Sequence, residues 1–272
     1  MWLKEEEMAL LGYDELYRAI LGVESTNLGK AFEFAKRVLC VQPHPDDTDF
    51  AAGGLIAKLT KRGCEVAYVT MTDGRIGNLD PSLYQEKLAS VRVEEQKEAA
   101  EILGVKKLMW LNYRDSELKV TIEARNKLAT LIREFQPDLI LTVDPWLTYE
   151  AHPDHVATGT LAVEAAFFAL FPHANPGDVR GGLRPHPTAF IAFYWTRKPN
   201  VYVDITDYMD VKLKAVSSHK SQYPPGGFEE VENLLKTYSV LMGKKMGVRY
   251  AEAFKVLSPL RHLHCCVYAE DL

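Results

Sequence analysis

The order of short apolar segments and longer helical segments constrains the fold of this chain most. Between residues 37 and 171, four apolar segments of strand length are each followed by a segment in which apolar residues recur at helical spacing. The expected strands are 37–42, 65–74, 107–113 and 138–145, and the expected helices are 49–63, 82–104, 121–136 and 153–171. Strands that alternate with helices of this length build βαβ units, so the sequence predicts a mainly parallel sheet.

The remaining segments extend this pattern at both ends. Residues 1–34 have the spacing of a helical arm, and residues 172–187 are rich in Pro and Gly, which favours a loop. Further strands are expected at 188–196 and 201–206, then helices at 207–220 and 228–246, then a short C-terminal strand region. No boundary is evident, and we expect one α/β domain over residues 1–272, a Rossmann-like three-layer sandwich.

Composition excludes several classes of protein. The chain has 272 residues, 47% hydrophobic and 25% charged, with a net charge of −5 and no long basic run, so neither nucleic acid nor an anionic membrane is expected as the main partner. Three glutamates stand near the N-terminus, and no apolar run approaches the ~20 residues of a membrane span. The four cysteines form no C-x-x-C pair. We expect a soluble, cytoplasmic protein with reduced thiols.

Polar clusters follow each of the four main strands. They lie at 44–49, 72–78, 112–115 and 144–155. Because ligands of open α/β sheets bind outside the carboxyl ends of the strands, these clusters are expected to share one site.

Two of these clusters have the residues of a metal site. His44 and Asp47 are three residues apart at a strand-to-helix turn, and the stretch HPDH (152–155) begins another helix. Either motif alone also occurs as an ordinary helix start, but two of them at neighbouring strand ends favour a metal. Two imidazoles and one carboxylate with an open fourth position form a common catalytic zinc site, although the same set suits Fe(II). We predict His44, Asp47 and His155 as ligands, with Asp46 and His152 left beside the metal as base and acid.

The chain resembles the LmbE-like or PIG-L superfamily over residues 40–258. The motifs that carry the resemblance occur in the family's order: HPDD at 44–47, TDG at 72–74, R-x-x-E at 92–95, HPDH at 152–155 and HKSQ at 219–222. The resemblance implies a zinc-dependent de-N-acetylase, with Zn²⁺ as cofactor and an N-acetylglucosaminyl group as substrate. The chain length, the N-terminal arm and the RHLHCC stretch further imply small chitooligosaccharides as substrates and a homo-oligomer, a hexamer.

The resemblance also implies residue roles. Asp46 is the expected general base, and His152 is expected to stabilise the oxyanion or protonate the leaving amine, with Asp154 as a possible orienting partner. By family position, Arg92 and Asp115 are expected to contact sugar hydroxyl groups, with a salt bridge as the alternative role of Arg92.

Two further residues are candidates for the site. Trp146 lies beside the fourth strand end and is expected either to stack on a sugar face or to pack in the core. A strand-like stretch HLHCC (262–266) would place His262 and His264 on one face. The resemblance suggests that His264 reaches an active site as a second acid, in its own or an adjacent subunit.

The chain departs from the family pattern at three places. Pro43 replaces the usual Ala and Thr48 the usual Glu of A-H-P-D-D-E, and we expect Asp49 to take over that Glu's role behind the ligands. Many relatives carry Tyr two residues before the first His of HPDH, where this chain has Glu150, with Tyr149 one residue earlier.

Three alternative functions are compatible with parts of the pattern. The first is a de-N-acetylase of another N-acetylglucosamine conjugate, such as an inositol or thiol-sugar conjugate. The second is a metal-dependent phosphoesterase, which predicts two metals and a bridging carboxylate. The third is a non-catalytic sugar-binding module, against which the intact Asp46 and His152 argue.

Overall fold

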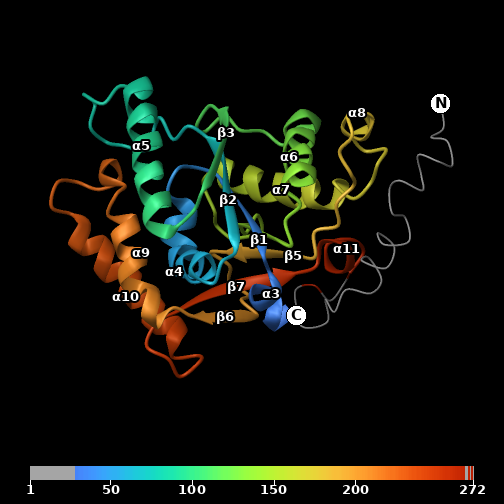
Figure 1. Ribbon diagram of the computed structural model, residues 1–272. Helices are drawn as coiled ribbons and strands as arrows, with labels where there is room; N and C mark the ends of the chain where they lie inside the picture. The colour runs from blue at the N-terminus through green and yellow to red at the C-terminus, as the bar shows by residue number, and fades with distance from the viewer. Residues whose placement is uncertain (1–27, 267–268, 270, 272) are drawn as a thin grey trace.

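A computed structural model describes residues 28–266, 269 and 271 (Figure 1). The arm expected over residues 1–34 therefore lies mostly outside the described residues, and the single domain over 1–272 remains a prediction. Its last part is helical, as a 3₁₀ turn at Leu28–Lys30 (η1) and a short helix at Ala31–Phe34 (α3). Within the described ranges, no helix is both long and apolar enough to span a membrane.

The core of the molecule is a seven-stranded sheet with the order β3-β2-β1-β4-β5-β7-β6. Strands β1 to β5 are parallel, and β7 runs antiparallel to both β5 and β6. The expected α/β fold with a mainly parallel sheet is confirmed. The strands are β1 Arg37–Gln42, β2 Glu65–Thr72, β3 Lys107–Tyr113, β4 Leu139–Val143, β5 Phe190–Tyr194, β6 Val201–Asp204 and β7 Ala251–Leu257.

Helices cover both faces of the sheet, which makes three layers (Figure 1). Alternate residues of β1 point to opposite faces: Val38 and Cys40 pack with α4, α5 and α9, and Leu39 and Val41 pack with α6 and α7. The main helices are α4 Asp47–Lys61, α5 Gln85–Leu103, α6 Ile122–Phe135, α7 Pro153–Phe168, α9 Met209–Val216 and α10 Phe228–Gly243.

Two segments differ from the expected elements. The Pro- and Gly-rich segment 172–187 is not wholly a loop, because Pro176–Arg180 form the short helix α8. The helix expected at 207–220 is confined to α9, and 3₁₀ turns flank it at Thr206–Tyr208 (η2) and Lys220–Gln222 (η3).

The expectation of a strand at HLHCC is wrong. Pro259 opens the short helix α11, Pro259–His262, because proline at a first helical position lacks only an N–H that the helix does not use. Cys265 then adopts a positive φ of 57°, which breaks any alternation of side chains. His262 and His264 therefore do not share one face of a strand.

The sheet order places the site. Strand β1 has β2 on one side and β4 on the other, and the connections from β1 and β4 turn toward opposite faces. A crevice opens between the two connections at the carboxyl ends of the strands. The connections after β1 (43–46) and after β4 (144–152) carry the two HPD motifs.

A buried ion pair fixes α4, whose first turn belongs to this crevice. The Nζ atom of Lys212 in α9 lies 2.7 Å from Oε1 of Glu252 in β7, and both side chains are buried. The Glu252 carboxylate also accepts hydrogen bonds from the backbone N–H groups of Gly54 and Leu55 in α4. One carboxylate thus joins α4, α9 and β7.

We expect Lys212→Met to lower the free energy of unfolding by about 3–5 kcal/mol, because it leaves Glu252 charged and buried without its cation. Denaturant titration followed by circular dichroism measures the loss. Lys127→Met is the matched control, since Lys127 pairs with Glu123 on the surface of α6 and its loss is expected to leave stability nearly unchanged. Equal stability of the two variants would show that the buried pair does not fix α4.

Candidate metal and catalytic site

The turn between β1 and α4 has an unusual backbone. Asp46 has φ 118° and ψ −36°, a conformation that residues with a side chain rarely adopt, at a cost of about 1–3 kcal/mol. The helix starts at the next residue, and the carbonyl of Asp46 accepts the N–H groups of Asp49 and Phe50. This tight turn directs His44, Asp46 and Asp47 toward the same crevice.

The start of α7 brings the second motif to the crevice. His152 is the N-cap of α7, and its Nδ1 atom accepts the backbone N–H of Asp154 at 3.3 Å. Pro153 occupies the first helical position. The cap places His155 one turn into the helix, facing Asp47.

His44, Asp47 and His155, the predicted ligands, lie together as one group of possible metal ligands, and His44, Asp115, His152 and Asp154 form a second. His44 Nδ1 lies 3.2 Å from Asp47 Oδ2, and His155 Nε2 lies 3.6 Å from Asp47 Oδ1. Ligand atoms about 2.1 Å from a tetrahedral zinc ion lie roughly 3.4 Å apart. The spacing of these donor atoms therefore fits a single divalent ion.

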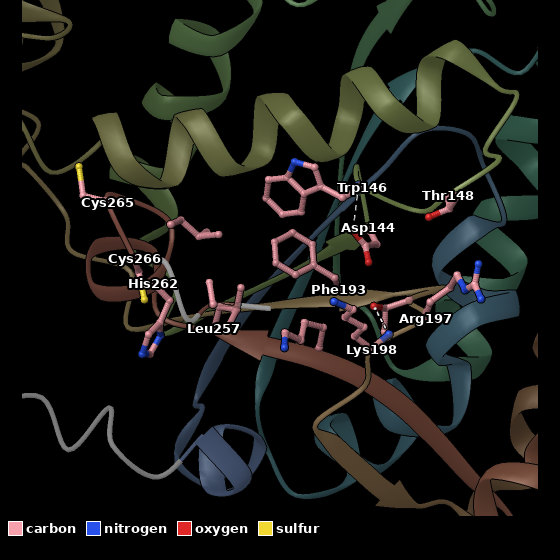
Figure 2. Close-up of a pocket in the computed structure, with 14 residues that line it drawn as sticks. Asp144, Trp146, Thr148, Phe193, Arg197, Lys198, Leu257, His262, Cys265 and Cys266 are labelled. Atoms are coloured by element: carbon pink, nitrogen blue, oxygen red, sulfur yellow. Dashed lines mark hydrogen bonds between the residues drawn. The ribbon is translucent and has the colours of Figure 1, made fainter. Parts of the chain in front are cut away.

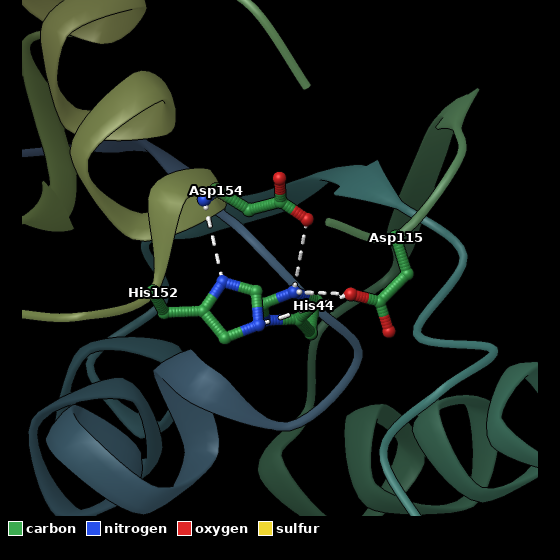
Figure 3. Close-up of side chains that lie close together, drawn as sticks. All are labelled: His44, Asp115, His152 and Asp154. Atoms are coloured by element: carbon green, nitrogen blue, oxygen red, sulfur yellow. Dashed lines mark hydrogen bonds and ion pairs between the residues drawn. The ribbon is translucent and has the colours of Figure 1, made fainter. Parts of the chain in front are cut away.

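The other nitrogen of each imidazole faces a carboxylate. His44 Nε2 lies 3.3 Å from both Asp115 Oδ1 and Asp154 Oδ2 (Figure 3). His155 Nδ1 lies 3.2 Å from Glu150 Oε2. Metal-binding histidines usually bond their second nitrogen to a carboxylate in this way, which orients the ring and leaves the first nitrogen for the metal. Both rings are thus held with their ligand nitrogens toward Asp47.

Negative charge dominates this part of the crevice. Burial opposes a positive charge on His44, but hydrogen bonds to Asp115, Asp154 and Asp47 outweigh it and raise the pKa of His44 well above its ordinary value. Burial also works against ionisation of Asp47, yet His44 and His155 lower its pKa to about 2. Three carboxylates around one imidazole form a donor set that a divalent cation would neutralise.

Asp46 and His152 stand beside this group, and burial shifts the pKa of each. Burial raises the pKa of Asp46 to about 6 against the opposing charge of Arg92. Burial, together with His44 and His155, lowers the pKa of His152. Because Nδ1 of neutral His152 accepts the N–H of Asp154, its proton is on Nε2, which lies 3.8 Å from Asp115 Oδ1. His152 thus offers an N–H donor toward the crevice, and the backbone of Asp154 orients it.

Arg92 and Asp115 also lie at the crevice. Arg92 of α5 is buried, and its guanidinium bonds the carbonyl oxygens of Pro45 and Gly74 and pairs with the Asp46 carboxylate at 3.0 Å. Asp115 is buried as well; its Oδ2 accepts the N–H of Ile76, and its Oδ1 has no hydrogen-bond donor besides the facing histidines.

A cavity of about 1020 Å³ is lined by residues of the connection after β4, of β5 and of β7. Trp146 lines it with 61% of its surface exposed, and its ring meets Phe193 edge to face. Figure 2 shows Thr148 and Arg197 at one end of the cavity and Cys265 and Cys266 at the other. Of the two roles expected for Trp146, the exposed ring excludes burial in the core.

His264 does not join the site of its own chain. Its side chain is exposed, and its ring stacks on Phe167 of α7 with 5.2 Å between centroids. Phe167 is twelve residues after His155 on the same helix, a separation of roughly 18 Å along the axis.

The sequence analysis missed the role of Glu150. Its Oε1 atom accepts the N–H of His152, while its Oε2 atom faces His155. In the sequence, Glu150 stands out only as a departure from the family's Tyr. Its position five residues before the predicted ligand His155, in the same strand-end cluster, is the sequence feature that could have indicated a contact with that ligand.

Comparisons with known proteins agree with this arrangement of residues. A family model described as "PIG-L: GlcNAc-PI de-N-acetylase" matches residues 39–166. The diacetylchitobiose deacetylase of Thermococcus kodakarensis is 44% identical over 257 residues, which cover 94% of this chain and 96% of that protein. A probable N-acetyl-alpha-D-glucosaminyl L-malate deacetylase 2 of Bacillus anthracis is 32% identical, over 69% of this chain and 82% of that protein.

A solved structure is similar along the whole chain. The N,N′-diacetylchitobiose deacetylase from Pyrococcus horikoshii, in complex with its inhibitor MPG, is 43% identical with a TM-score of 0.87. The alignment covers 100% of this chain and 99% of that one. The similarity therefore includes the sheet, the crevice and the segments outside the family model.

We expect Glu150→Ala to weaken zinc binding by about 10- to 100-fold, because His155 loses the carboxylate that orients its ring. Competition with a chromogenic chelator measures the affinity. Glu164→Ala, a substitution of a half-buried glutamate further along α7, is the matched control and is expected to bind zinc normally. Unchanged affinity of Glu150→Ala would show that His155 is not a ligand or needs no orienting carboxylate.

Proposed function

Since the chain belongs to the PIG-L/LmbE family of deacetylases, we propose that it removes the N-acetyl group from N-acetylglucosamine units of small chitooligosaccharides such as diacetylchitobiose, releasing acetate. One observation carries this proposal. His44, Asp47 and His155 form a metal-binding group, and Asp46 and His152 stand beside it without being part of it. A metal-dependent hydrolase of amides needs this combination of ligands, base and donor.

Zinc is the metal that we propose for this group, on the basis of its two imidazoles, its carboxylate and their spacing. When bound, zinc would supply Lewis acidity, which lowers the pKa of water and polarises the acetyl carbonyl. The ligands in this proposal are His44, Asp47 and His155.

Asp46 is the proposed general base. Its carboxylate takes a proton from the water that attacks the acetyl carbon, and it passes this proton to the amine nitrogen as the C–N bond breaks. The products are acetate and the free amino sugar, so the proton is conserved within the site. Arg92 holds the carboxylate from one side, which limits the directions in which Asp46 can point.

His152 is the proposed oxyanion donor. Its Nε2–H points into the crevice, because its Nδ1 is bonded to the backbone at the start of α7. A neutral N–H donor stabilises negative charge that develops on the carbonyl oxygen as water attacks. Protonation of the leaving amine, the other role expected of His152, would require its imidazolium form, which burial disfavours.

The sugar contacts in the proposal are Asp115, Arg92 and Trp146. Asp115 Oδ1 can accept a sugar hydroxyl, and Arg92 Nη1 keeps a second N–H besides the one that bonds Gly74. Trp146 offers an exposed ring to a sugar face in the cavity that it lines. This arrangement favours a small amino-sugar substrate of one or two units.

The alternatives make different demands on the site. The second group that could hold a metal, which consists of His44, Asp115, His152 and Asp154, shares His44 with the first. Two-metal phosphoesterases place their ions about 3.5–4 Å apart across a bridging ligand. Two ions held by the two nitrogens of one imidazole ring lie further apart than about 3.5–4 Å. Another N-acetylglucosamine conjugate remains a second candidate substrate, which the similarity to the malate-conjugate deacetylase favours.

His264 is proposed to act in the site of a neighbouring subunit. It is exposed and far from its own crevice, so within the described residues it reaches a site only through another copy of the chain. This role goes with the hexamer that the family resemblance implies.

We expect the zinc-loaded protein to release acetate from diacetylchitobiose and Asp46→Asn to lose about 10²- to 10⁴-fold in kcat, because the amide cannot take the proton. Acetate is measured by a coupled assay, after metal removal with a chelator and restoration with zinc. Asp210→Asn serves as the control, since Asp210 is an exposed residue in the first turn of α9.

Three outcomes would change the proposal. Acetate release from the malate conjugate alone would replace the substrate and keep the chemistry. Phosphate release from a sugar phosphate would make a metal-dependent phosphoesterase the favoured function. Normal activity of Asp46→Asn would remove Asp46 as the base.

We expect mixed oligomers of Asp46→Asn and His264→Ala to regain activity that neither variant has alone. With random 1:1 mixing and one partner per site, about a quarter of the sites combine an intact Asp46 with an intact His264 from the neighbour. The variants are mixed after mild dissociation, and acetate release is compared with each unmixed variant. Full activity of unmixed His264→Ala, or no recovery after verified subunit exchange, would contradict the role in a neighbouring site.

A further inference from the structure

We propose that Gln96 is a positioning residue, which holds the peptide group between Pro45 and Asp46 and thereby aims the Asp46 carboxylate. This inference rests on the proposed role of Asp46 as the base. It adds a residue of α5 that none of the motifs includes and that touches neither the metal-binding group nor the crevice where substrate binds.

The polar atoms of this one peptide group are both held by α5. The N–H of Asp46 donates to Gln96 Oε1 at 2.9 Å, and the C=O of Pro45 accepts Arg92 Nη2 at 2.6 Å. Residues 92 and 96 are four apart, so their side chains leave α5 from the same face. The two side chains therefore fix the plane of the peptide from its two ends.

The plane of this peptide decides where Asp46 points. Rotation of the plane changes ψ of Pro45 and φ of Asp46 together, and φ of Asp46 is 118°. The preferred backbone region of an L-residue lies at negative φ, so an unrestrained Asp46 would turn away from this conformation. A change in φ would swing its Cα–Cβ bond, and with it the carboxylate, relative to the crevice.

Gln96 is itself held rigidly. Its Nε2 donates to Asp49 Oδ2 at 2.8 Å, and its Oε1 also accepts Gln42 Nε2 at 2.8 Å. Asp49 in turn accepts the hydroxyl of Tyr68 and faces His219 Nε2, each at 2.8 Å. All of these side chains are buried. The amide therefore has one orientation, in which its oxygen faces the N–H of Asp46.

Gln96 contacts none of the predicted metal ligands, so its role can be tested separately from metal binding. Its hydrogen-bond partners among the described residues are the backbone N–H of Asp46 and the side chains of Gln42 and Asp49, and none of them is a predicted ligand or sugar contact. Loss of the amide is thus expected to misdirect the base while the metal and the substrate still bind. This combination appears as a lower kcat at nearly constant KM.

The test uses Gln96→Met, which keeps the length of the side chain and removes both hydrogen-bonding atoms. In the zinc-loaded full chain, kcat on diacetylchitobiose is expected to fall by about 10- to 100-fold, the effect of displacing a catalytic group by ~1 Å. KM, zinc content and zinc affinity are expected to stay near those of the unsubstituted protein.

Thr70→Val is the matched control. It removes another hydrogen bond of the same buried network, from Gln42 Nε2 to Thr70 Oγ1, and leaves the Asp46 peptide untouched. Its kcat is expected to remain close to that of the unsubstituted protein, whatever happens to its midpoint of thermal unfolding. If Gln96→Met fails to fold, Gln96→Asn provides the same test, since its shorter amide no longer reaches the N–H of Asp46.

The outcomes distinguish this inference from the proposed function. Normal kcat in the folded Gln96 variant, a loss no greater than that of Thr70→Val, or a loss that follows zinc content would overturn the positioning role. Absence of acetate release from the unsubstituted zinc-loaded protein would instead overturn the proposed function. Normal kcat in Asp46→Asn would overturn the premise that Asp46 is the base.

Discussion

Three carboxylates lie around the His44 ring, and the arrangement of the rest of the crevice depends on this concentration of negative charge. Asp47 faces Nδ1 of the ring, and Asp115 and Asp154 face Nε2. The three carboxylates follow three different strands, so only the parallel sheet order brings them together. Each also accepts at least one backbone N–H from a neighbouring turn, which offsets part of the cost of burying it. The remaining negative charge gives the site its affinity for a cation.

A second layer of buried polar side chains, which includes Asp49 and Gln96, lies beneath the carboxylates around His44. It contacts the backbone of the turn at Asp46. Asp49 was expected to stand behind the ligands in place of the family's Glu, at whose position Thr48 is buried. The structure places Asp49 one layer deeper, where it accepts hydrogen bonds from Tyr68 and Gln96 and faces His219. Its connection to the site runs through the Gln96 amide to the backbone N–H of Asp46.

The parts of the molecule that the sequence predicted well are those set by local pattern. Strand and helix alternation depends on periodicity within ten or twenty residues. The predicted ligand set rests on two motifs that begin helices, and the structure brings these three side chains together. Gln96 escaped prediction because its partner is fixed by a tertiary contact: it meets Asp46 across 50 residues of sequence. Glu150 escaped for a different reason, since its partners His152 and His155 are only two and five residues away but the HPDH motif does not include it. The prediction for the stretch after Pro259 was wrong for a local reason. The sequence HLHCC resembled a strand, but Pro259 begins a short helix and Cys265 adopts a positive φ, which makes a turn.

Helix α5 shows why hydrophobic periodicity alone describes this fold incompletely. A helix packed on a sheet normally buries an apolar face, but the inner face of α5 includes Arg92, Glu95 and Gln96. Each of these side chains holds a different loop or turn: Arg92 and Gln96 hold the turn before α4, and Glu95 binds both the N–H and the hydroxyl of Ser221. Since every one of them has partners, their burial costs far less than that of unpaired groups. The R-x-x-E motif therefore connects the HPDD turn to the HKSQ segment through the interior of the protein, and α5 is a scaffold for the turn at Asp46 as well as a layer of the sandwich.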